Sequence, residues 1–144
     1  MITGLKTVKH RLKSPEKDLI VREISGHLMR CHEEIVTAYC HGSFLKDAFR
    51  DIDLALLLYT ALEETLFYEV SLETELDKLI PYNLDIRVLN KAPVSFCQAV
   101  VRGEVILDRD PNHRAEFESR VLKEYFDFAS FRQRYLSEVL NAPF

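Results

Sequence analysis

The sequence predicts an α/β protein in which helices pack on a mixed β-sheet of three to four strands and a helical segment follows at the C-terminus. Short β-branched and apolar runs alternate with segments whose apolar residues recur at helical spacing. No internal repeat or low-complexity linker interrupts this pattern. At 144 residues, 47% hydrophobic and 29% charged, the chain is long enough to bury a core as one domain. We place that core at about residues 16–107, and the C-terminal helical segment at about 111–140, of a single domain spanning 1–144.

The first half of the chain is expected to form one helix and two strands. Ser14 and Pro15 suit the N-cap and the first position of a helix. A β-branched and aromatic run predicts the first strand. A nearly continuous apolar run predicts a second strand that is buried on both faces. The expected bounds are 14–30 for the helix, 35–40 and 52–58 for the strands, and 44–49 for a short helix between them.

The second half continues the alternation of helices and strands. A helical apolar spacing ends at Pro81, which cannot continue a helix. The next run alternates apolar and polar residues, as in a strand with one polar face. A short helix then stops at Gly103 before a final edge strand. The expected bounds are 62–80 and 94–102 for the helices, and 84–89 and 105–107 for the strands.

The C-terminal segment is expected to be helical from Asp110-Pro111 onward. One unbroken helix over 111–140 would span roughly 45 Å at 1.5 Å per residue, which is wider than a domain of this size. We therefore expect a break near Ser130, where a capping box begins, or a helix end that docks elsewhere. Four aromatic residues at helical spacing either pack onto the sheet or form a surface for a partner or a second copy. They are Tyr125, Phe128, Phe131 and Tyr135.

Composition limits the classes of function. The net charge of −4 disfavours broad nucleic-acid binding, which usually relies on a basic surface. No apolar run approaches the ~20 residues that span a bilayer, and the basic N-terminus lacks the apolar core of a signal peptide, so a cytoplasmic protein is expected. Cys31, Cys40 and Cys97 form no CxxC pair and predict no disulfide framework.

Two carboxylates open the second strand. Asp51 and Asp53 are two residues apart, so they point to the same side of a strand, with Cα atoms roughly 6.5–7 Å apart. Like charges this close repel unless a cation or strong donors compensate them. Asp85 lies on the polar face of a later strand, beside Arg87, and completes the set if the two strands are neighbours. Carboxylate oxygens are the ligands that magnesium prefers, so this pattern predicts a site for two such ions.

A lone Asp-x-Asp at a strand start is more often a solvated edge or a turn cap. The chain contains a second such motif, Asp108-Arg109-Asp110. There Arg109 is expected to neutralise the two acids, and Asp110 to cap the helix that begins at Pro111. We assign that motif no chemistry.

A glycine-serine turn precedes the acidic pair. Gly42 follows a strand directly and permits a bend or a close backbone approach. Ser43 suits the cap of a short helix, whose free amides attract anions such as phosphate. Lys46 lies in the same turn as a further candidate for binding a nucleotide. The plain alternative is a turn with an N-cap and a solvated lysine.

Together these residues resemble the signature of the polymerase-β-type nucleotidyltransferases, and most closely their minimal (MNT) members. The resemblance rests on Gly42-Ser43, Asp51-Ile52-Asp53 and Asp85, and covers about residues 16–107. It implies the nucleotidyltransferase fold, two Mg²⁺ ions on the carboxylates, and ATP as substrate. Gly42 and Ser43 would hold the β- and γ-phosphates. The loop to Asp51 is shorter than the common family form and lacks a glycine often found there.

Proteins of this kind are similar to the antitoxins of HEPN–MNT toxin–antitoxin pairs. The resemblance implies transfer of AMP from ATP to a tyrosine of a HEPN toxin partner. Two alternatives remain open: nucleotide transfer to a small molecule, and a non-catalytic binding module that neutralises its partner by contact. A homo-oligomer is also possible.

Overall fold

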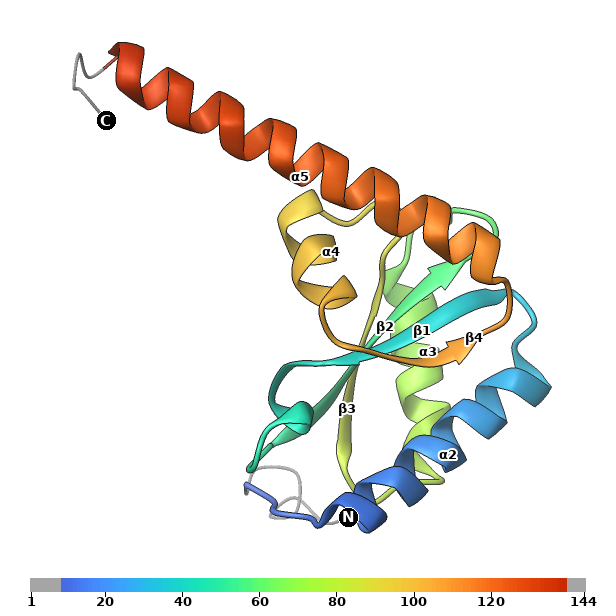
Figure 1. Cartoon of the computed structure of the whole chain (residues 1–144). Helices are drawn as coiled ribbons and strands as arrows, with labels where there is room; N and C mark the ends of the chain where they lie inside the picture. Colours follow the sequence, from blue (N-terminus) through green and yellow to red (C-terminus); the bar gives the residue numbers. More distant parts are fainter. Residues whose placement is uncertain (1–8, 140–144) are drawn as a thin grey trace.

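A four-stranded mixed sheet lies between two groups of helices in this computed structural model, which describes residues 9–139 (Figure 1). Helices α2 and α3 cover one face of the sheet, and α4 and α5 cover the other. The elements are α2 (Ser14–Cys31), β1 (Ile35–His41), η1 (Gly42–Leu45), β2 (Asp51–Leu58), α3 (Leu66–Asp77), β3 (Asn83–Val88), α4 (Val94–Val101), β4 (Glu104–Asp108) and α5 (Pro111–Val139). This arrangement confirms the predicted fold class.

The strand order is β3-β2-β1-β4. β1 pairs antiparallel with β2 and β4, whereas β2 pairs parallel with β3. The inner position of β2 confirms the prediction from its apolar run, and β4 is an edge strand as expected. The free edge of β3 is covered by α3, because the side chains of Glu73 and Glu69 accept hydrogen bonds from the N–H groups of Ile86 and Val88 at 2.7 and 2.8 Å.

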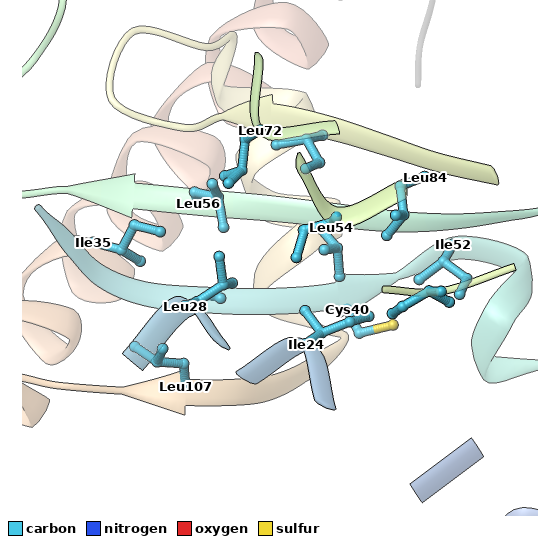
Figure 2. Close-up of a cluster of buried hydrophobic side chains, with 14 of the residues drawn as sticks. Ile24, Leu28, Ile35, Cys40, Ile52, Leu54, Leu56, Leu72, Leu84 and Leu107 are labelled. Carbon is cyan, nitrogen blue, oxygen red and sulfur yellow. The ribbon is translucent and has the colours of Figure 1, made fainter. Parts of the chain in front are cut away.

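Each face of the sheet has its own apolar core. On the first face, Ile24 and Leu28 from α2 and Leu72 from α3 pack against strand residues such as Leu54 and Leu56 (Figure 2). Side chains of this size contribute about 1.5–3 kcal/mol each when fully buried. On the second face, the buried residues of α4 and α5 are Cys97, Val100, Phe117 and Val121.

The predicted bounds of three helices are wrong, including the end of α3, which lies at Asp77 rather than at residue 80. Ser14 is the first helical residue of α2 rather than its cap, and Lys13 occupies the cap position. The helix expected over 44–49 is instead a single 3₁₀ turn, η1, which spans Gly42–Leu45. α3 begins at Leu66 rather than at residue 62, because the Glu64 carboxylate accepts hydrogen bonds from the first two helical N–H groups.

The predicted break in the C-terminal helix is also wrong. α5 is continuous over Pro111–Val139, and the sequence after Pro111 has no glycine or proline until the helix ends. Phe117 and Val121 anchor its first half, and the Tyr39 hydroxyl donates a hydrogen bond to Glu118 at 2.7 Å. The second half extends away from the rest of the chain (Figure 1).

The four aromatic residues singled out from the sequence, all in α5, do not pack onto the sheet. Phe128, Phe131 and Tyr135 are 54%, 62% and 53% exposed, and Tyr125 is half-buried. This excludes the core-packing interpretation and leaves an apolar surface on the extended half of the helix. No helix within residues 9–139 has both the length and the apolar character needed to cross a membrane. All three cysteines are free, as predicted.

Candidate functional site

The three predicted carboxylates come together at one end of the parallel pair of strands. The register of β2 and β3 places Asp53 opposite Asp85, and Asp51 opposite Asn83. Asp53 shares a face of β2 with Ala55, which belongs to the core beneath α4 and α5. The three acids therefore lie on the α4/α5 side of the sheet, and we call them the carboxylate site.

Negative charge dominates this site. Burial raises the pKa of Asp53 to about 6, and the charges of Asp85 and Asp51 act in the same direction. Arg87 opposes this shift in the pKa, and its Nε donates to Asp85 at 3.1 Å. Asn83 donates to Asp51 at 2.9 Å. These neighbours leave the carboxylates undercompensated, which fits hard divalent cations such as Mg²⁺.

The glycine of the predicted turn lies against the same carboxylates. Gly42 has a φ of 73°, a conformation that L side chains rarely adopt. A Cβ atom there would stand 2.3 Å from Oδ2 of Asp53, so a side chain at this position would displace the Asp53 carboxylate. The positive φ and the close approach of the backbone to the Asp53 side chain both favour glycine at this position. Ser43 follows within η1 and is half-buried.

A family model supports what this geometry indicates. Residues 24–112, more than half of the chain, match the model for polymerase beta, nucleotidyltransferase. The chain belongs to this nucleotidyltransferase family. The matched region contains the glycine-serine turn and all three carboxylates. No curated protein matches the chain.

Solved structures with the same fold include components of toxin–antitoxin complexes. A chain from a MntA–HepT toxin–antitoxin structure is 21% identical, with a TM-score of 0.67 and coverage of 85% of this chain and 98% of that one. A structure of a tri-AMPylated Shewanella oneidensis HEPN toxin with its MNT antitoxin gives 22% identity, a TM-score of 0.68 and coverage of 86% and 98%. A toxin–antitoxin structure with AMP-PNP gives 19% identity, a TM-score of 0.62 and coverage of 89% and 99%.

Lys46, the remaining residue that the sequence predicted for nucleotide binding, lies at the C-terminal end of η1. Its side chain is exposed. Lys17 of α2, not Lys46, holds the turn: its ammonium donates to the carbonyls of Phe44 and Lys46, each at 2.6 Å. Lys17 also lies 5.1 Å from the centre of the Phe44 ring. No local pattern predicts these two contacts, because Lys17 is 27 residues from Phe44 and 29 residues from Lys46 in the sequence.

His41 lies beside the carboxylate site. It pairs with Asp53 across β1 and β2, and its buried Nε2 has no hydrogen-bond partner in the part of the chain that the structure describes. Burial lowers the pKa of His41, and this outweighs the opposing effect of Asp85. The neutral imidazole therefore does not compensate the carboxylates.

A cavity of about 400 Å³ lies next to the carboxylate site. Two of its lining residues contact the site: Arg87 pairs with Asp85, and the Phe96 ring meets His41 edge-on with 5.6 Å between ring centres. The cavity borders the carboxylate site through these two residues, and none of the three carboxylates is among its lining residues. It is lined by Thr65, Glu69, Arg87, Val88, Lys91, Ala92, Pro93 and Phe96.

The second Asp-x-Asp motif has a structural role in this nucleotidyltransferase. Asp108 pairs with Arg114 of α5 at 2.9 Å, and the Asp110 carboxylate accepts from the His113 N–H at 3.1 Å, as a helix cap does. The prediction that Arg109 neutralises both acids is wrong. Its guanidinium instead donates to backbone carbonyls at the end of α2 and the start of β1.

Proposed function

We propose that this protein transfers AMP from ATP to a hydroxyl group of a HEPN-type protein partner, in a magnesium-dependent reaction, and thereby acts as an antitoxin. The observation that carries this proposal is the convergence of Asp51, Asp53 and Asp85 on two neighbouring strands. Family membership supports the reaction class. The similarity to toxin–antitoxin structures, one with an AMPylated toxin and one with AMP-PNP, supports the nucleotide and the partner.

The three carboxylates have distinct proposed roles. Asp51 and Asp53 would hold two Mg²⁺ ions together with Asp85, and the bound ions would neutralise the phosphate charges and activate the acceptor hydroxyl. The acceptor oxygen forms a bond to the α-phosphorus of ATP, and the bond from that phosphorus to the bridging oxygen of the β-phosphate breaks. Asp85 accepts the proton from the hydroxyl, and pyrophosphate leaves.

The glycine-serine turn would bind the leaving phosphates. Because Gly42 brings the backbone within reach of Asp53, the N–H groups of the turn and the Ser43 hydroxyl can face phosphates that share the metal ions. η1 has only four residues, so these local groups, rather than a helix dipole, would supply the contacts. Lys46 adds an exposed positive charge.

The partner is proposed to dock on the extended half of α5. This surface exposes large apolar side chains beyond the last buried residue of the helix, Val121. The exposed residues are Phe126, Phe128, Phe131, Tyr135, Leu136 and Val139.

A labelling experiment tests the proposed reaction. The chain is incubated with ATP labelled on the α-phosphate, Mg²⁺ and its cognate HEPN protein, and the label is expected on a tyrosine of the partner. Asp53→Ala should abolish labelling, whereas Asp108→Asn, in the second Asp-x-Asp motif, should retain it. Labelling that survives Asp53→Ala excludes the proposed site.

The same assay separates the alternatives. Label on small hydroxyl compounds, with none on protein, would favour a small-molecule nucleotidyltransferase. Protection of cells by an Asp51→Ala/Asp53→Ala variant as complete as by the wild type would favour neutralisation by contact alone. Phe128→Asp/Phe131→Asp on the exposed face of α5 should weaken the partner's binding at least tenfold, as measured by calorimetry, with an unchanged circular dichroism spectrum.

A further inference from the structure

A second cluster of ionisable side chains lies between α2 and α3. His27 and His32 come from the C-terminal end of α2, and Glu75 comes from α3. Nε2 of His27 and Nε2 of His32 both contact the same oxygen, Oε2 of Glu75, the second at 2.6 Å. The three donor atoms all lie within 4.8 Å of one another. We call these three residues the His–Glu cluster.

An outer layer of polar side chains orients this cluster. Nδ1 of His32 lies 2.9 Å from Oε2 of Glu34, which also accepts a hydrogen bond from the Tyr68 hydroxyl at 2.8 Å. This places a carboxylate behind His32 and directs the opposite nitrogen of the ring toward Glu75. A carboxylate behind a histidine ligand is the usual support of protein zinc sites, because it fixes the tautomer and raises the basicity of the ligand.

We propose that the His–Glu cluster binds a divalent transition-metal ion of the zinc class, through Nε2 of His27, Nε2 of His32 and Oε2 of Glu75. Imidazole and carboxylate ligands suit zinc, whereas magnesium prefers oxygen ligands alone. Zinc takes such ligands at about 2.0–2.2 Å, so tetrahedral donor atoms stand roughly 3.3 Å apart. The distance of 2.6 Å between His32 and Glu75 would thus open by about 0.7 Å, which small side-chain rotations provide.

The surroundings of the cluster permit an ion to enter. The side chains of His27 and His32 are 18% and 19% exposed, and that of Glu75 is 40% exposed. The ligands are therefore partly shielded yet reachable from solvent. Three protein ligands leave a fourth tetrahedral position for water.

This site is separate from the carboxylate site. The His–Glu cluster lies on the α2/α3 side of the sheet, at the end where Ile35 pairs with Leu58. The carboxylate site lies on the α4/α5 side, at the opposite end of the same strands, where His41 pairs with Asp53. A metal ion at the His–Glu cluster would therefore tie the end of α2 to α3, and it would stabilise the fold without taking part in nucleotide transfer.

Calorimetry on the full chain tests this proposal. The protein is freed of metal with EDTA, which is then removed, and titrated with Zn²⁺ in excess Mg²⁺ so that the carboxylate site is already filled. One Zn²⁺ per chain is expected to bind. Glu75→Gln and His32→Ala should each weaken binding at least tenfold, and Glu34→Gln should weaken it about tenfold through His32. Circular dichroism checks that each variant is folded.

Two controls make the result specific. Asp51→Asn/Asp53→Asn should change zinc affinity less than twofold, and Cys31→Ala should do the same, although Cys31 lies beside His27. Co²⁺ in place of Zn²⁺ reports the ligands through its visible absorption, which should change in His27→Ala but not in Cys31→Ala. The proposal is overturned if the wild type binds no Zn²⁺ at about 100 µM, or if His27→Ala/His32→Ala binds it as the wild type does.

Discussion

The carboxylate site and the His–Glu cluster differ in how the negative charge of their acidic residues is compensated. In the carboxylate site, Asp53 faces Asp85 and Asp51, and burial together with these charges raises its pKa to about 6. In the His–Glu cluster, hydrogen bonds from His32 and His27 lower the pKa of Glu75. Burial would lower the pKa of His32, but its hydrogen bonds to Glu75 and Glu34 outweigh burial and raise it.

The difference indicates which cluster stabilises the metal-free fold. Like charges held close together destabilise the fold until a cation binds between them. Opposite charges stabilise the fold without a ligand. A site of the first kind persists because a function requires it, at the expense of stability. The family match includes the carboxylate site, and the proposed reaction is placed there. The comparison therefore yields tests in which activity and stability change in opposite directions.

The largest expected effect is on activity. Asp85→Asn should lower kcat for transfer about 10²–10⁴-fold, because it removes the proposed proton acceptor and a metal ligand. Single-turnover labelling of the partner measures this change. Asp108→Asn serves as the matched control and should retain activity, since Asp108 pairs with Arg114 far from the reaction. An Asp85→Asn enzyme as fast as the wild type would remove Asp85 from the mechanism.

The next largest expected effect is a gain in stability when Asp53 is replaced by Asn, and this gain depends on pH. Because the folded pKa of Asp53 is about 6, above the unfolded value of 3.8, the folded state favours the protonated acid. Its contribution to stability is present below about pH 4 and is lost as the pH rises through 6. In EDTA, Asp53→Asn should therefore raise the free energy of unfolding by about 1 kcal/mol at pH 7.5, a value discounted for partial exposure.

Urea unfolding at two pH values measures this gain. The difference between the wild type and Asp53→Asn should nearly vanish at pH 4. A variant that is less stable than the wild type at pH 7.5 would contradict the view that the carboxylate site is strained by its own charge. Saturating Mg²⁺ should reduce the difference, because the ion binds the wild-type carboxylates more tightly.

Removing the acid of the His–Glu cluster should have the opposite effect and lower the free energy of unfolding. Glu75→Gln removes the negative partner of two histidines, so in EDTA it should lower the free energy of unfolding by about 1 kcal/mol. Urea unfolding at pH 6, below the raised pKa of His32, measures this loss. Glu116→Gln, which alters a solvent-exposed acid on α5, should change stability by less than about 0.5 kcal/mol. An increase in the stability of Glu75→Gln would remove the contrast between the two clusters.

The sequence predicted the part of the carboxylate site that depends on local pattern. The apolar run after Asp53 and the alternation around Asp85 identified their strands, because side-chain direction follows from a period of two. The contribution of Asn83 was missed, since it depends on the parallel register of β2 and β3. The wrong break in α5 has a different cause: the expectation assumed a helix no longer than the domain, whereas helix length follows from local propensity and capping.

The His–Glu cluster was not predictable in this way. His32 and Glu75 are 43 residues apart in the sequence, and each is an ordinary polar residue, His32 just after α2 and Glu75 within α3. Only the packing of Leu28 and Leu72 into one core brings α2 and α3 together on the same face of the sheet. Contacts that depend on such packing have no local signature, so tertiary structure was needed to find them.

The smallest expected effect on activity is that of removing Lys46, whose charge is exposed, unlike the charges of the two clusters compared above. An exposed lysine contributes at most about 1 kcal/mol to a charge contact, so Lys46→Ala should lower kcat/KM for ATP by about fivefold or less. Lys17→Met should have the larger effect, because the Lys17 ammonium holds two carbonyls of the turn beside the carboxylate site. Initial-rate kinetics on both variants tests this order. A greater loss of kcat/KM in Lys46→Ala than in Lys17→Met would mean that the Lys46 side chain binds phosphate directly. The charge of Lys46 would then matter more than the position of the turn.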